Sequence, residues 1–268
     1  MTLPFAAHPA LIGMVHLDAL PGAPEFGGDL EAVARRAAED AAALAAGGVD
    51  AILVENFHDA PFYKDHLPPE TIAALTRCAL AVRAAAPAVP LGINALRNDG
   101  IGALAVAVAV GAAFIRVNVL CGAMVTDQGL IEGCAAELIR RRRALGAAVA
   151  ILADVGVKHA EPLGGFDLAQ VAKDTVLRGR ADALVVSGRG TGEPTPRAKI
   201  EAVRAAAPGV PVLVGSGATV ASVDPAAADG FIVGTALKVD GRVDAERVAA
   251  MRAALGPRRE RGATRSGR

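Results

Sequence analysis

The chain has 268 residues, of which 53% are hydrophobic and only 3% aromatic, so Ala, Val, Leu and Ile must fill one large core. The 28 Lys and Arg residues balance 28 Asp and Glu residues, which excludes the strongly basic surface of a nucleic-acid-binding protein. The most apolar run, residues 101–119, contains two glycines, Arg116 and Asn118, which favours a short helix and a buried strand over membrane insertion.

Short apolar runs alternate with Ala-rich amphipathic stretches along the whole chain. Strands are predicted at residues 11–17, 51–56, 91–96, 114–119, 150–156, 183–188, 211–216 and 230–235. Helices are predicted at residues 30–46, 70–86, 100–110, 132–145, 167–178, 197–206 and 245–255, with a short one near 225–228. Eight evenly spaced units favour a closed (β/α)8 TIM barrel, an α/β fold, over an open doubly wound sheet.

The turns that enter three predicted strands share a loose pattern. Gly48-Val49-Asp50-Ala51 precedes the second strand, and similar segments with an Asp precede the sixth and the eighth. Together the eight units are expected to form a single domain over residues 1–256. The Arg- and Gly-rich residues 257–268 are expected to be a disordered tail. Three cysteines without CxxC spacing and the absence of a signal-like N-terminus favour the cytoplasm.

Polar residues gather at the ends of the predicted strands. They are His16, Glu55, Asn94, Arg116, Asn118, Asp154, Ser187, Ser216 and Thr235, with Lys158 just beyond the fifth strand. A charge inside a buried strand costs several kcal/mol unless it is paired or hydrogen-bonded. The carboxyl ends of barrel strands meet on the face where such barrels do their chemistry, so we expect one shared site there. The alternative is that some of these groups only pair with one another to close the barrel.

Glycine-rich turns follow the seventh and eighth strands. They contain Gly215, Ser216 and Gly217 in one case, and Gly234 and Thr235 in the other. Backbone N–H groups in such turns, together with the predicted short helix, suit a phosphate group, so a phosphorylated small molecule is the expected partner. Ordinary tight turns also favour glycine, and this alternative stays open.

Several loops, among them residues 56–63 and 121–129, are expected to lie across the barrel mouth or to contact a neighbouring subunit. The loop after the sixth strand carries Ser187, Arg189 and Thr191, which we interpret as substrate-binding residues on a lid. Its glycine spacing does not match a dinucleotide fingerprint, and a plain connector is the other interpretation. The first loop, residues 18–28, is expected to lie across the mouth or to contact a neighbouring subunit, as in a homo-oligomer.

Several segments together resemble the BtpA/SgcQ family. They are LIGMVHLDALPGAPEFGG, GVDAILVENFHDAPF, LGINALRNDG, FIRVNVLCGAMVTDQGLIEG, ADVGVKHAEPL, DALVVSGRGTGEPT, PVLVGSGAT and ADGFIVGTALKVDG, within residues 11–241. The resemblance implies a barrel related to the ribulose-phosphate-binding group. It also implies links to photosystem I biogenesis for some members and to sugar metabolism for others, but it assigns no catalytic residues.

The residues themselves point to an enzyme of the lyase or isomerase type that acts on a phosphorylated sugar or a related metabolite. A desolvated Lys158 can form a Schiff base or act as a base, with Asp154 or Glu55 as the partner acid or base. Asn94, Arg116 and Asn118 are expected to bind the substrate, and His16 is a further catalytic candidate.

Two other functions stay open at this point. One is a metal-dependent hydrolase, in which a divalent metal is held by His16, Glu55, Asp154 and His159. No HxH or HExxH spacing supports that site. The other is a non-catalytic factor for the biogenesis or regulation of a membrane complex.

Overall fold

The strands close into a parallel eight-stranded barrel, as the sequence predicts. The structure is a computed structural model that describes residues 3–5, 7–188, 193–257 and 259–260. Neighbouring strands follow one another around the barrel in chain order: β2 (Ala10–His16), β3 (Ala51–Glu55), β4 (Leu91–Asn94), β5 (Phe114–Val117), β8 (Ala150–Asp154), β10 (Ala183–Val186), β11 (Val212–Val214) and β12 (Gly230–Val233). Closure comes from β12 and β2, which pair from Gly230 opposite Ala10 to Val233 opposite Gly13.

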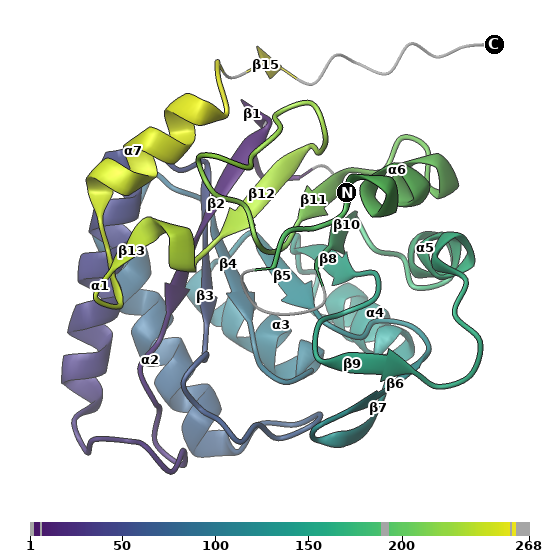
Figure 1. The fold of residues 1–268 in the computed structure, drawn as a ribbon. Helices are drawn as coiled ribbons and strands as arrows, with labels where there is room; N and C mark the ends of the chain where they lie inside the picture. The colour runs from purple at the N-terminus through teal and green to yellow at the C-terminus, as the bar shows by residue number, and fades with distance from the viewer. Residues whose placement is uncertain (1–2, 6, 189–192, 258, 261–268) are drawn as a thin grey trace.

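Helices surround this barrel (Figure 1). They are α1 (Leu30–Gly47), α2 (Pro69–Ala85), α3 (Gly100–Val110), α4 (Ala135–Ala144), α5 (Leu168–Leu177), α6 (Arg197–Ala206) and α7 (Ala245–Ala254). α1 ends at Gly48, whose φ of 87° is a left-handed conformation that glycine adopts without strain. α4 begins later than predicted, because Glu132 belongs to a strand.

The short helix predicted near residues 225–228 is wrong. These residues form turns, in which the Asp224 side chain accepts a hydrogen bond from Ala226 N. So short a segment gains too few hydrogen bonds to offset the cost of starting a helix. A 3₁₀ turn, η1 (Thr235–Leu237), instead follows β12.

The barrel interior is filled by side chains at every second strand position. Phe114 fills the space opposite Gly92, where a side chain would clash with its ring, and Phe5 packs edge-on against Phe114 with centroids 5.9 Å apart. A separate, larger cluster of Val, Leu, Ile and Ala lies between the strands and the helices. Apolar layers therefore occupy the lower barrel and leave the carboxyl ends of the strands for polar groups.

Additional strands lie at both ends of the barrel. A three-stranded sheet of β7 (Gly129–Glu132), β6 (Ala123–Thr126) and β9 (Ala160–Pro162) stands at the carboxyl end (Figure 1). β13 (Lys238–Val239) pairs with β14 (Arg242–Val243), and β1 (Ala7–His8) with β15 (Arg259–Glu260). Most of the tail predicted to be disordered lies outside the described residues, so that expectation stays a prediction. No helix in the described ranges is long and apolar enough to cross a membrane.

Candidate functional site

The period-two geometry of the strands places the predicted polar residues in one ring. Ile12, Met14 and His16 alternate along β2, so His16 follows two inward-facing apolar residues. His16 pairs in register with Glu55, and Glu55 with Asn94, which in turn pairs with Arg116. The strand ends therefore bring these side chains to one end of the barrel, as expected.

A buried network joins the middle of this ring. The Arg116 Nε and Nη2 atoms each donate to a different oxygen of Asp154 at 2.9 Å, and Asn118 Nδ2 donates to Asp154 Oδ2 at 2.9 Å. Asn94 Nδ2 donates to Asn118 Oδ1 at 3.3 Å. Burial alone would lower the pKa of Arg116, but the paired Asp154 carboxylate outweighs it and raises that pKa. Arg116 therefore stays cationic, and both Asp154 oxygens are already engaged.

Two buried polar atoms of the ring have no partner among the described residues. They are Asn94 Oδ1 and Ser187 Oγ, on side chains that are almost completely buried. Ser187 Oγ lies beside Gly215, where an added methyl group would stand 2.6 Å from it and 3.3 Å from Arg116 Nη2. Buried polar atoms normally find a partner, so these two mark places where a ligand or a water molecule can bind.

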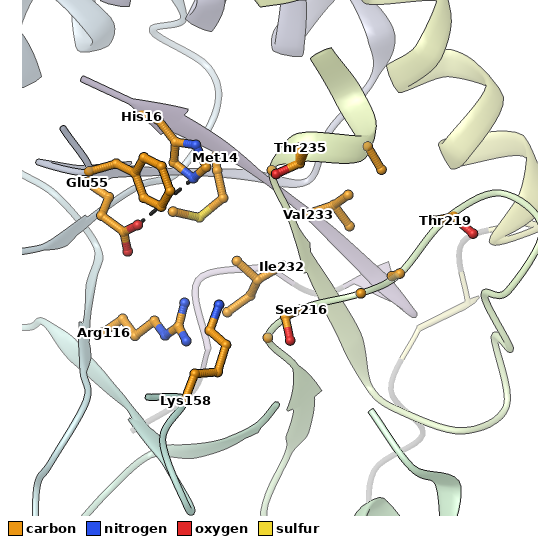
Figure 2. A pocket seen from close by; sticks show the side chains of 16 residues that line it. Met14, His16, Glu55, Arg116, Lys158, Ser216, Thr219, Ile232, Val233 and Thr235 are labelled. Carbon is orange, nitrogen blue, oxygen red and sulfur yellow. Dashed lines mark ion pairs between the residues drawn. The ribbon is translucent and has the colours of Figure 1, made fainter. Parts of the chain in front are cut away.

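A cavity of about 230 Å³ lies beside this ring at the carboxyl end of the barrel. His16, Glu55, Arg116 and Lys158 line one side, and the turns at 215–219 and 234–236 line the other. Figure 2 shows Arg116 and Lys158 pointing toward the space between Glu55 and Ser216. Charged and acid–base groups thus face glycine-rich backbone across one small volume.

Burial shifts Glu55 and Lys158, two ionisable groups of this cavity, toward their neutral forms. It raises the pKa of the Glu55 carboxyl, although nearby Arg116 acts against the shift. It lowers the pKa of Lys158, and the charge of Arg116 lowers it further. Both shifts move these pKa values toward neutrality, the direction that suits a pair of groups for proton transfer.

His16 is an uncharged imidazole in this setting. Burial, followed by the nearby charge of Lys238, lowers its pKa to about 3. Its Nε2 atom lies 3.9 Å from Glu55 Oε1, and its ring stacks on Phe57 at a centroid distance of 4.2 Å. The contact with Glu55 is therefore a polar contact of a neutral ring, not an ion pair.

The two glycine-rich turns lie where the sequence places them. Gly217 has a φ of 74°, and a side chain there would collide with the Glu193 carbonyl. A side chain at Gly234 would meet the His16 ring at 2.8 Å. Packing therefore requires these glycines, and the missing side chains also leave the backbone of both turns open to the cavity.

Some of the predicted site residues are not placed in the cavity. Arg189 and Thr191 lie outside the described residues, and Asp154, Asn94, Asn118 and Ser187 lie in or just beside the ring without lining this cavity. Within the described ranges no group of three or more His, Cys, Asp or Glu side chains could hold a metal ion. Asp154, one of the proposed ligands, is instead bound by Arg116 and Asn118.

Sequence reasoning missed three residues near the site. Phe57 lines the cavity, Lys238 acts on His16, and Arg97 lines an adjoining space. Each lies a few residues beyond the end of a barrel strand, Phe57 and Arg97 in loops and Lys238 in β13, where the period of the barrel strand no longer tells which way a side chain points. The unusual concentration of rings at residues 57–63 was the available signal for Phe57.

The fold is shared with enzymes that are only distantly related in sequence. KGPDC from Streptococcus mutans superposes with a TM-score of 0.59 at 14% identity, over 92% of this chain and 97% of that chain. Phosphoribosyl anthranilate isomerase from Thermus thermophilus gives 0.55 at 17% identity, over 92% and 98%. At these identities the likeness shows the barrel fold alone.

Sequence relatives are much closer. Photosystem I biogenesis protein BtpA of Synechocystis is 50% identical over 242 residues, which cover 90% of this chain and 84% of the relative. The sgc region protein SgcQ of Escherichia coli is 35% identical over 237 residues, 87% of each chain. The BtpA family description matches residues 7–255. The chain therefore belongs to the BtpA family, as the sequence motifs indicate.

Proposed function

We propose that this protein is an enzyme that binds a phosphorylated small metabolite at the carboxyl end of the barrel and isomerises or cleaves it by proton transfer. One observation carries the proposal: a single cavity joins acid–base groups to two glycine-rich turns. The turns suit a phosphate because their N–H groups can approach it without interference from side chains. A KGPDC structure with the same fold was solved in complex with D-ribose 5-phosphate, which supports a phosphosugar as ligand.

The chemistry is assigned to Lys158 and Glu55. Lys158 takes a proton from the carbon beside a substrate carbonyl, while Glu55 gives its proton to the carbonyl oxygen. Arg116 stabilises the negative charge that develops on that oxygen. Lys158 then gives its proton to the former carbonyl carbon, and Glu55 takes the hydroxyl proton of the neighbouring carbon, which becomes the new carbonyl and completes an isomerisation. Attack of the neutral Lys158 amine on the carbonyl, with loss of water, is the Schiff-base route to a lyase.

Asp154 has a different role in this proposal. Because both of its oxygens bind Arg116 and Asn118, it positions the guanidinium and is not the proton-transfer group. Glu55 is thus the better of the two carboxylates considered from the sequence.

Titration calorimetry with inorganic phosphate and ribose 5-phosphate tests the binding site. Both ligands are expected to bind, and Thr235→Glu should weaken them at least about tenfold, because it places a carboxylate beside the turn that receives the phosphate. Leu177→Glu, an equally acidic change on a side chain that is 72% exposed on α5, serves as the control. Failure of both ligands to bind, or equal binding by both variants, would contradict the phosphate site.

Deuterium exchange tests the chemistry. In D₂O, the protein should replace the hydrogen on the carbon beside the carbonyl of a pentose or hexose ketose phosphate with deuterium. Proton NMR measures this exchange as the loss of that hydrogen's signal. Glu55→Gln and Lys158→Met should each reduce the exchange rate about a hundredfold or more, the usual contribution of an acid–base group. Borohydride trapping of ligand on Lys158 separates the Schiff-base route from simple base catalysis.

A second candidate function rests on the relationship with the Synechocystis protein, whose name assigns it to photosystem I biogenesis. A barrel used only as a scaffold would gain nothing from the ionisable groups that this cavity buries. Normal support of biogenesis by the Glu55→Gln and Lys158→Met variants would favour a scaffold over an enzyme.

A further inference from the structure

A second and larger cavity adjoins the first at the barrel mouth. Its volume is about 770 Å³, within the range of small-molecule sites. It shares Glu55, Phe57, Arg116 and Lys158 with the smaller cavity. A molecule held by its phosphate in the first cavity can therefore extend past these residues into the second.

The second cavity contains a cation without a matching anion. Arg97 is only 8% exposed, and its Nη2 atom donates to the Lys158 carbonyl at 2.6 Å. Within the described residues no hydrogen bond or ion pair joins Arg97 to a carboxylate. Arg116, Arg142 and Arg252 differ in this respect, because each binds an aspartate at 2.7–2.9 Å.

This arrangement is costly unless a ligand completes it. Burial lowers the pKa of Arg97 even though Asp154 and Asp127 act in the opposite direction, so the desolvation of its charge is not compensated. A guanidinium keeps its proton at any ordinary pH. A buried charge that cannot be neutralised requires an anion, and the open side of Arg97 faces the cavity.

The charge balance of the cavity selects the kind of anion. Glu25 and Asp127 also line it, and the other lining guanidinium, Arg116, is already bound to Asp154, so a doubly charged phosphate would meet two carboxylates with Arg97 as its guanidinium partner. A singly charged carboxylate matches one guanidinium in charge and in planar geometry. Phe57, Phe62 and Leu96 provide an apolar wall for the carbon skeleton that carries it.

We propose that Arg97 forms a second anion subsite, which takes a carboxylate on the far end of the same phosphorylated substrate. The substrate class is thus a phosphorylated carboxylic acid in which an apolar segment separates the two acidic groups. This inference rests on the phosphate site of the proposed function, and the experiment separates the two.

The test uses ω-phosphonoalkanoates of increasing chain length, each compared in titration calorimetry with the methyl ester of its carboxyl group, which keeps the phosphonate and has no carboxylate. The free acid should bind about tenfold or more tightly than its ester at one optimal length, where both groups reach their subsites together. Arg97→Gln should remove this difference and leave the affinity for inorganic phosphate unchanged. Arg77→Gln, on the outside of α2, is the matched control and should behave as the unmodified chain does.

Each other result overturns a specific part. Equal binding of acids and esters at every length would refute the carboxylate subsite while leaving the phosphate site in place. An Arg97→Gln variant that loses inorganic phosphate and both probes equally would show that Arg97 only supports the Lys158 loop. If no phosphonate binds at all, the phosphate site itself fails, and this inference fails with it.

Discussion

At the scale of single residues, the ring contains two kinds of buried charge. Arg116 and Asp154 satisfy each other through two hydrogen bonds, and Asn118 adds a third to the carboxylate. Glu55, Lys158 and Arg97 form no ion pair with one another in the described residues, although each is largely buried. The first kind holds the site together, and the second kind is available to a ligand.

Breaking the satisfied pair should cost much stability. Asp154→Leu leaves the buried Arg116 charge without its partner, and we expect a loss of about 3–5 kcal/mol in the free energy of unfolding. The double variant Asp154→Leu with Arg116→Met removes both charges and should recover most of that loss. Urea denaturation of Asp154→Leu, of Arg116→Met and of the double variant gives the coupling free energy between the two charges. Additive losses would mean that the pair contributes no mutual stabilisation.

Removing the unsatisfied charges should instead stabilise the fold. We expect Lys158→Met and Glu55→Gln each to gain about 1 kcal/mol near neutral pH, the common size of such gains at functional positions. Circular dichroism during urea denaturation measures the change. A loss of stability in both variants would mean that these residues are structural.

The two gains should depend on pH in opposite directions. The folded pKa of Lys158 is below its ordinary 10.5, so its penalty is complete below the folded value and disappears as the pH rises toward 10.5. The folded pKa of Glu55 is above its ordinary 4.5, so its penalty is absent below 4.5 and develops as the pH rises through the folded value. The Lys158→Met gain should therefore shrink in alkali, and the Glu55→Gln gain should shrink in acid. Denaturation series at several pH values will show whether the trends diverge.

At the scale of elements, a repeated aspartate connects neighbouring strands at the amino end of the barrel. Asp50, Asp182 and Asp229 each precede a strand, and each accepts the backbone N–H of an adjacent strand: Leu11, Ile151 and Val212, at 2.8–2.9 Å. An arginine pairs with each of them: Arg252, Arg142 and Arg204 respectively. The aspartate seen in the sequence before the second, sixth and eighth strands thus links each of these strands to its neighbour.

Substitution of one of these aspartates should affect stability and not binding. Asp182→Ala leaves both Ile151 N and Arg142 without this acceptor, and we expect a loss of about 3 kcal/mol. Asp182→Asn keeps an acceptor for Ile151 N and should lose about half as much. Urea denaturation measures both variants, with phosphate titration as the companion measurement. A weakened phosphate affinity at unchanged stability would contradict the assignment of this end to folding.

Local sequence predicts some elements better than others. The eight barrel strands are apolar runs covered on both faces, so their positions are visible without any tertiary information. Predicted strands extend one or two residues too far because apolar residues such as Leu17 and Val155 continue after strand pairing ends. The hairpin of β6 and β7 was missed because its short, partly exposed strands do not form continuous apolar runs, and the pairing of β6 with β9, more than 30 residues away, leaves no local pattern.

At the scale of the whole molecule, barrel topology explains why the site could be located from sequence although its chemistry could not. Closure brings the last inward-facing residue of each strand to one end, so His16, Glu55, Asn94 and Arg116 had to meet. Which of them pair with each other depends on side-chain directions and loop paths. Asp154 therefore resembled a catalytic carboxylate in the sequence, whereas the structure shows it bound to Arg116.

The two ends of the barrel should respond independently to substitution. At one hundred times its dissociation constant, a ligand that binds only the folded chain adds about 2.7 kcal/mol of stability. For a chain of this size, that corresponds to a rise in melting temperature of roughly 5–10 °C.

Phosphate should therefore raise the melting temperature of Asp182→Asn as much as that of the unmodified chain, starting from a lower value. Thr235→Glu should start from the unmodified value and, because its phosphate affinity is at least about tenfold weaker, show at most about half of that rise. Differential scanning calorimetry with and without phosphate compares the three proteins. A smaller rise in Asp182→Asn than in the unmodified chain would contradict this independence. It would show that the packing of the strands at the amino end of the barrel affects ligand binding at the carboxyl end.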